Sequence, residues 1–322
     1  MLQNFKTISQ PHILLSSVLV SFSVCIHSQI KHYPNVTLDT CGIGRQSLLT
    51  TKNCFKWSSN VTTSVQNGRL AQPGEWPWIV YIYSTYYFLE FIPLEWVYCT
   101  GVILNTNWII TAAHCIHSGH TLTVRTVQDS NDKSHIYGVN QWFRHPLYTD
   151  KLKDYFDIAL LKLDSNIPIT HTAGYYTVNG ICLPEKNIVN IDDELGLVAG
   201  FGYIDQGVSN PGPLRTGWLK LMKIFTNSTD AWGAWIIAFR YPTNGGTATC
   251  KGDSGGPLIQ NVLSSDSSDG QNRAVLIGVS SSLAVNKPVG YCLNPDPTTQ
   301  MVFMRVSKFI EWIVETVLSN TN

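Results

Sequence analysis

The sequence predicts an all-β protein, a sandwich or barrel of many short strands that ends in one helix. From residue 71 onward, short runs rich in Val, Ile and aromatic residues alternate with clusters of Gly, Pro, Asn, Asp and Ser, which is typical of strands joined by turns. The 24 Gly and 15 Pro are spread along the chain and suit a turn-rich β protein. Residues 307–318 repeat apolar side chains at helical spacing, with Ser307 as the expected N-cap.

The predicted strands lie in a chain whose 322 residues are enough for one large domain or two small ones. In order, they are WPWIVYIY, TGVILN, WIITAA, DIALLKL, LGLVAGFG, AVLIGVS and MVFMRV. The formal net charge is zero, the pI is near 7.1, and no block of like charge occurs. This balance argues against nucleic-acid partners and against acidic membranes, and we expect no membrane partner.

Residues 1–28 have the features of a signal peptide. Lys6 lies in the polar leader, an apolar run extends from Ile13 to Ile26, and small and polar residues surround Ser28. The alternative is a membrane anchor, but a span needs about 20 apolar residues, and this run is shorter and is interrupted by four serines. We therefore expect a secreted, extracellular protein without a membrane span.

Residues 29–64 are polar and lack apolar periodicity, so we expect a tethered pro-segment rather than a domain, followed by one domain over 65–322. Of the eight cysteines, Cys25 lies in the leader. The remaining cysteines are odd in number, so one thiol lacks an intramolecular partner. Sequons, which accept glycans on exposed loops of exported chains, begin at Asn35, Asn60 and Asn227.

The segment Gly252–Leu258 (GDSGGPL) carries the strongest chemical signal. Glycines on both sides of Ser254 permit a tight turn in which the N–H groups of Gly252 and Ser254 point to one place and hold a developing oxyanion. The alternative is an ordinary Gly-rich turn. That alternative does not explain why His114 follows one apolar run and Asp157 precedes another. A serine hydroxyl needs a base, and an imidazole both accepts and returns a proton near neutral pH.

TAAHC, DIALL and GDSGGPL, in this order, resemble the signature segments of the chymotrypsin/trypsin-like serine peptidases. The resemblance extends from about Val65 to the carboxyl terminus. It implies two six-stranded antiparallel β-barrels with a C-terminal α-helix, and hydrolysis of peptide bonds through an acyl-enzyme without a cofactor. It also implies that Ser254 is the nucleophile, His114 the base, and Asp157 the residue that orients the imidazole.

The same resemblance implies a set of disulfides. Cys99 is expected to pair with Cys115 and to clamp the His114 loop, and Cys250 is expected to pair with Cys292 beside the specificity pocket. Cys182 corresponds to the position that retains a cleaved pro-segment. Its partner is either Cys41 or Cys54, and the sequence leaves this choice open.

In the family that the chain resembles, activation cleaves the chain and frees a new amino terminus. Its amino group inserts beside the acidic residue that precedes the nucleophile, which is Asp253 in this sequence. Counting back from the PGEWPW segment places the new terminus at Val65. Ser64 precedes it rather than Arg or Lys, so a trypsin-like activator is not expected. A buried carboxylate without its ammonium partner is costly, so we expect the uncut form to be poorly shaped for catalysis.

The expected specificity pocket has an uncharged floor. Ala248 occupies the position where trypsin-like members carry Asp, so a cationic substrate side chain finds no charge compensation there. The walls are expected at Ser281, Leu283 and Met301, and their bulk suggests a shallow pocket. The prediction is a non-tryptic enzyme that prefers small or medium apolar P1 residues.

Two further patterns have competing interpretations. A metal site is one interpretation of the histidine string formed by His114, His117 and His120. The His-Glu-x-x-His pattern of helical zinc hydrolases is absent, so no metal is predicted. The aromatic segment from Tyr83 to Trp96 is either a buried hairpin or an exposed partner-binding loop.

The main functional prediction is a secreted serine endopeptidase acting on proteins or peptides, with protein inhibitors as possible partners and a monomeric state. The alternative is a weak or inactive homologue that keeps the fold for binding or regulation. The altered activation segment and crowded pocket favour that alternative, whereas the complete set of His114, Asp157 and Ser254 argues against it.

Overall fold

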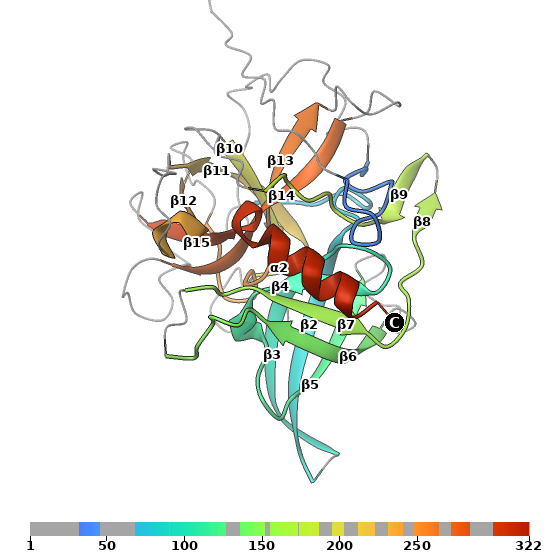
Figure 1. The fold of residues 1–322 in the computed structure, drawn as a ribbon, viewed down its shortest axis with the longest axis vertical. Helices are drawn as coiled ribbons and strands as arrows, with labels where there is room; N and C mark the ends of the chain where they lie inside the picture. Colours follow the sequence, from blue (N-terminus) through green and yellow to red (C-terminus); the bar gives the residue numbers. More distant parts are fainter. Residues whose placement is uncertain are drawn as a thin grey trace, which may run out of the picture.

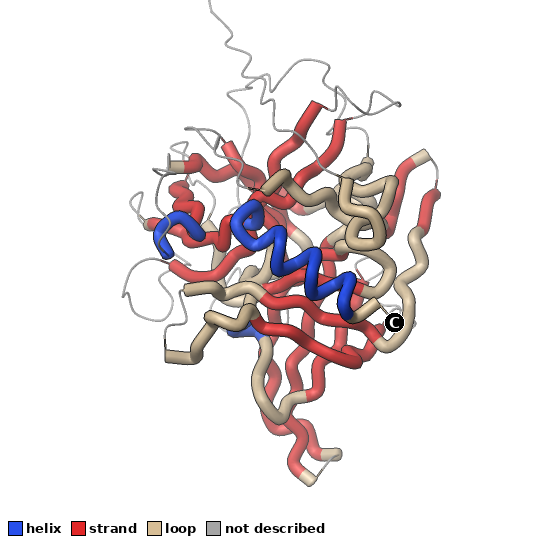
Figure 2. The backbone as a smooth tube through the Cα atoms, in the orientation of Figure 1, coloured by secondary structure: helices blue, strands red, loops and turns tan. Residues whose placement is uncertain are grey.

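The structure is a computed structural model. Strands gather into two β-barrels, and one α-helix lies across the front of the view (Figures 1 and 2). The prediction of an all-β, two-barrel fold with a C-terminal helix is confirmed. The described ranges are 32–45, 68–89, 91–126, 136–151, 155–172, 174–186, 195–202, 212–222, 231–240, 248–263, 272–283 and 299–321.

The first barrel is a closed antiparallel ring in the order β2-β3-β4-β7-β6-β5. Its interior is filled by β-branched and aromatic side chains, which suit a pleated, buried surface. All four residues of β4 are buried. The strands are β2 (Ile79–Phe88), β3 (Ile92–Ile103), β4 (Trp108–Thr111), β5 (Thr121–Thr126), β6 (Ile136–Arg144) and β7 (Ala159–Leu163).

The second barrel has the order β11-β10-β13-β14-β15-β12, and pairing of β12 with β11 closes the ring. The short strand β1 (Arg69–Leu70) adds to β11. Outside the barrels, β8 (Thr170–Thr172) and β9 (Tyr175–Val178) pair with each other. The strands of the ring are β10 (Leu195–Gly200), β11 (Arg215–Leu221), β12 (Trp235–Arg240), β13 (Pro257–Leu263), β14 (Asn272–Leu283) and β15 (Gln300–Arg305).

The C-terminal helix α2 (Val306–Ser319) joins the two halves, because it packs on β14 of the second barrel and contacts His145 after β6 of the first. The prediction that Ser307 is its N-cap was wrong. The helix begins at Val306, and the buried Ser307 hydroxyl has no hydrogen-bond partner. The preceding strand already fixes the direction of the chain, so the first turn forms without a side-chain cap. Among the described helices, none has the length and apolar character to cross a bilayer.

Residues 32–45 lie against the second barrel. Cys41 forms a disulfide with Cys182, so the structure selects Cys41 over Cys54, which lies outside the described residues. The N–H of Gly42 donates to the carbonyl of Gly180 at 2.8 Å, and the Ala274 N–H donates to the Gly42 carbonyl at 2.9 Å. Asn35, one of the predicted glycan acceptors, is exposed in this segment. Asn60 and Asn227 lie outside the described residues.

Candidate active site

His114 and Asp157 are in contact at the edge of the first barrel. His114 lies in the short 3-10 turn η1 (Ala113–Cys115), and Asp157 comes two residues before β7. The ring Nδ1–H donates to Asp157 Oδ2 at 2.7 Å, and the backbone N–H of His114 donates to Oδ1 at 2.8 Å. Because the carboxylate accepts at Nδ1, the neutral ring keeps its free lone pair on Nε2.

The carboxylate of Asp157 is buried, with 1% of the side chain exposed, whereas His114 retains 27%. A buried carboxylate must be satisfied by hydrogen bonds. A third donor comes from the second barrel, since the Ser281 hydroxyl donates to Oδ2 at 2.6 Å. The sequence analysis assigned Ser281 to the pocket wall and missed this contact. A serine in a strand carries no local signal for a partner 124 positions away.

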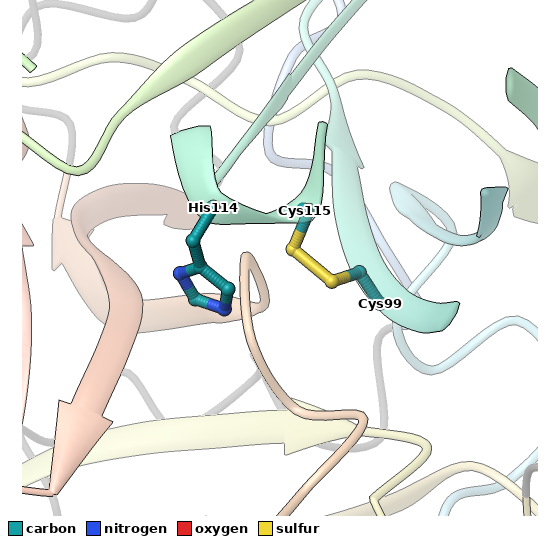
Figure 3. Close-up of side chains that lie close together, drawn as sticks. All are labelled: Cys99, His114 and Cys115. Carbon is teal, nitrogen blue, oxygen red and sulfur yellow. A yellow bond between two sulfur atoms is a disulfide. The ribbon is translucent and has the colours of Figure 1, made fainter. Parts of the chain in front are cut away.

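The His114 turn is held by the Cys99–Cys115 disulfide, which joins β3 to η1 (Figure 3). This is the pairing that the resemblance implied. The two sulfur atoms and the His114 ring lie within 4.8 Å of one another, but sulfurs bonded to each other offer no thiolate to a metal. His117 and His120, the other residues of the histidine string, stack with ring centroids 5.1 Å apart.

Ser254 lies in the turn before β13, and backbone hydrogen bonds tie this turn to both barrels. Its carbonyl accepts from the Thr100 N–H of β3 at 2.8 Å, and the Gly255 N–H donates to the Ser280 carbonyl of β14 at 2.7 Å. The Cys115 sulfur lies 3.8 Å from the Ser254 carbonyl oxygen, so the turn is adjacent to His114. The Ser254 hydroxyl forms no hydrogen bond within the described residues. Such contacts often tighten only when substrate binds.

The glycines around Ser254 meet steric requirements of the turn. Gly252 has a φ of 96° and Gly255 a φ of 79°, a left-handed region that favours glycine. The Thr100 hydroxyl donates to the Gly252 carbonyl at 2.8 Å. Neither the Gly252 N–H nor the Ser254 N–H donates to an acceptor within the described residues, which leaves both donors available to an oxyanion. The sequence analysis did not identify Thr100.

Asp253 is buried behind the turn. Its carboxylate accepts from the Gly202 N–H and from the Cys250 N–H, both at 2.8 Å. Burial raises the pKa of Asp253 to about 7, and these two hydrogen bonds only partly oppose it. Val65, the predicted new terminus, lies outside the described residues.

The predicted pocket residues lie at the ends of β14 and β15 and next to Cys250. Ala248 and Met301 are fully buried in one cluster, and the Thr249 N–H donates to the Met301 sulfur at 3.3 Å. Leu283 faces Met301 in the strand register. Cys250 is disulfide-bonded, and its predicted partner Cys292 lies outside the described residues.

Comparison with known proteins agrees with this geometry. The family model described as Trypsin matches residues 65–313. An ovochymase from Halocynthia roretzi is 30% identical over 80% of this chain, and coagulation factor XI from Bos taurus is 30% identical over 62%. The aligned regions span only 15% and 32% of those two proteins.

The two antiparallel barrels and the match to this family together identify a serine peptidase domain of the hydrolase class. The chain belongs to the trypsin family.

Proposed function

We propose that this chain is an active serine endopeptidase in which Ser254 is the nucleophile, His114 the general base and acid, and Asp157 the orienting carboxylate. The observation that carries the proposal is the buried Asp157 carboxylate. It accepts the backbone N–H and the ring Nδ1–H of His114, so the neutral ring keeps Nε2 as its acceptor, and Cys115, next to His114, lies against the Ser254 turn.

The chemistry follows from these positions. His114 Nε2 takes the Ser254 proton as the oxygen attacks the peptide carbonyl, and it returns the proton to the leaving amine. Asp157 stabilises the imidazolium that forms in between. The N–H groups of Gly252 and Ser254 receive the carbonyl oxygen as it becomes negative. Water then releases the acyl group from Ser254 by the same steps.

For specificity, we propose a preference for small or medium apolar P1 residues. Met301 is fully buried in the same cluster as Ala248, and its sulfur accepts from the Thr249 N–H, so the thioether fills space in the wall of the proposed pocket. The floor carries no acid to compensate a cationic substrate. A library of peptides that shows preference for Arg or Lys at P1 would contradict this part of the proposal.

For maturation, we propose that residues 1–28 direct export, that residues 29–64 form a pro-segment, and that cleavage before Val65 supplies an ammonium group to Asp253. Two considerations support this. The disulfides of the structure persist in oxidising compartments, and the raised pKa of Asp253 reflects a buried carboxyl that lacks a cation within the described residues.

The deciding experiment is covalent labelling by a fluorophosphonate probe after forced cleavage. A recognition site for a sequence-specific protease is placed directly before Val65, and the cleaved chain is compared with Ser254→Ala. The matched control is Ser118→Ala, since Ser118 is exposed in the loop after η1. We expect labelling of the wild type and of the control but not of Ser254→Ala. A folded, cleaved wild type that is not labelled would favour the non-catalytic binding homologue.

A further inference from the structure

The hairpin of β2 and β3 extends beyond the first barrel and ends in exposed apolar side chains. β5 pairs with β2 only as far as Thr85, so the segment beyond Thr85 is a two-stranded ribbon. It projects at the lower end of the view (Figure 1). The exposed side chains and their exposed fractions are Tyr86 41%, Tyr87 40%, Phe88 49%, Leu89 61%, Phe91 71%, Ile92 39% and Leu94 59%. Of the two interpretations of this segment, the structure excludes a buried hairpin.

The tip is apolar on both faces of the ribbon. Successive side chains of a strand point to opposite faces, yet Tyr86, Tyr87 and Phe88 are all exposed, and so are Ile92 and Leu94 of the facing strand. A lipid phase surrounds an inserted tip from all sides and so buries apolar side chains on both faces of the ribbon together. Exposed apolar patches of this kind mark interaction sites, and the two-sided distribution favours lipid.

From these observations we propose that the tip of this hairpin inserts into the interface of a zwitterionic phospholipid bilayer. The sequence between residues 83 and 98 holds no Lys or Arg and two acids, Glu90 and Glu95, so attraction to anionic headgroups does not contribute. This proposal departs from the expectation of no membrane partner, which was based on the balanced charge, because insertion here depends on apolar side chains.

The geometry sets the depth of insertion. From Thr85 to Phe88, the last residue of β2, the strand advances about 10 Å at roughly 3.3 Å per residue, and interfacial segments enter about 5–10 Å below the headgroups. The strands pair with each other as far as Phe88 and Ile92, but their outer edges carry unpaired backbone groups, which restricts them to the interface. Tyr86 and Tyr87 lie behind the tip, at the level where amphipathic rings prefer to sit.

The base of the hairpin is connected to the candidate active site. The Ser84 hydroxyl lies 3.0 Å from His120 Nδ1, and the Tyr86 ring packs on the His120 ring at 5.6 Å. β3 carries Cys99, which is bonded to Cys115 beside His114. Ile92 and Cys99 are about 23 Å apart along an extended strand. Because the tip would lie about 5–10 Å below the headgroups, membrane-bound protein would hold Cys99, and with it the His114 turn, about 13–18 Å above the lipid surface.

The test is flotation of the full chain with vesicles of pure phosphatidylcholine, at 0.1 and 0.5 M salt. We expect co-flotation that does not weaken at high salt and does not strengthen when phosphatidylserine is added. Phe88→Ser, Leu89→Ser and Phe91→Ser should each lower the partition coefficient by about tenfold. Combining all three should abolish binding. Leu147→Ser is the matched control, because Leu147 is 60% exposed on the same barrel outside the hairpin.

The outcomes are distinguishable because binding is measured without catalysis. All variants change exposed side chains, and unchanged thermal unfolding shows that they fold. Failure of the wild type to float overturns the proposal, as does an equal loss of binding in Leu147→Ser. A dimer in sedimentation velocity that Phe91→Ser dissociates, without vesicle binding, would instead assign the tip to a second copy of the chain.

Discussion

The two barrels contribute to the candidate active site in different ways. The first places His114 and Asp157 through direct contacts of their own atoms, at 2.7 and 2.8 Å. The second places Ser254 through backbone hydrogen bonds of its turn, while its hydroxyl has no partner within the described residues. Behind that turn lies Asp253, a buried carboxyl with a raised pKa.

The position of the base therefore depends on hydrogen bonds between His114 and Asp157 themselves. The position of the nucleophile turn depends instead on its glycine conformations and on the charge state of Asp253. Variants of the first barrel should therefore change catalysis while leaving stability almost unchanged. Changes at Asp253, Gly255 or Met301 of the second barrel should alter pH dependence, stability or specificity as well.

Asp157→Asn should lower kcat by about 10⁴-fold in the cleaved chain, because an amide favours the wrong tautomer of His114. The measurement is hydrolysis of an apolar peptide substrate, with thermal unfolding recorded in parallel. If kcat fell by less than tenfold, the proposed role of Asp157 would be incorrect.

The uncut chain should lose stability as the pH rises from 4 to 8. The folded pKa of Asp253, about 7, lies above the ordinary value of 3.8, so the folded state binds the extra proton between these pH values. The stabilisation is complete below pH 4 and is lost as the pH rises through 7, by about 4 kcal/mol at most. Urea unfolding at both pH values should show this loss in the wild type and not in Asp253→Asn. Equal pH dependence of the two proteins contradicts the prediction.

Gly255→Ala should destabilise the chain by about 2–3 kcal/mol and remove activity. A Cβ there would overlap the Thr111 hydroxyl and the Thr100 carbonyl, in addition to the strain of a φ of 79°. Gly119→Ala is the matched control, since its φ is also 79° but no atom lies within 4 Å of the added Cβ. Chemical denaturation of both should give a clearly larger loss for Gly255→Ala, and equal losses would mean that the seam between the barrels tolerates the methyl group.

Met301→Gly should change specificity more than it changes rate. Removing the thioether opens the space beside Ala248, so the ratio of kcat/KM for Phe over Ala at P1 should rise by about 10–100-fold. The cavity also lowers stability by about 2–3 kcal/mol. A variant that remains folded with an unchanged ratio would show that Met301 does not limit the pocket.

Ser281→Ala should have the smallest effect, about tenfold on kcat, because Asp157 loses one of its donors and keeps both from His114. Ser282→Ala serves as the neighbouring control. An effect as large as that of Asp157→Asn would mean that the second barrel, and not the first, determines the position of the carboxylate.

Much of this arrangement was predictable from short segments of sequence. Alternating apolar runs and turn residues predicted the strands, and three motifs identified the family to which the chain belongs. Contacts of residues outside these motifs were not predictable. The hydroxyls of Ser281 and Thr100 find their partners only after the barrels dock. Exposure of the aromatic hairpin was also left open, because burial of Phe91 or Leu89 depends on what the fold places above them.

The Cys41–Cys182 bond has a consequence for the proposed maturation. Cleavage before Val65 would divide the polypeptide without releasing its amino-terminal fragment, so the mature molecule would be a covalent heterodimer that separates only under reducing conditions. Any sugar attached to Asn35, or any receptor that recognises this fragment, would accompany the peptidase wherever it acts.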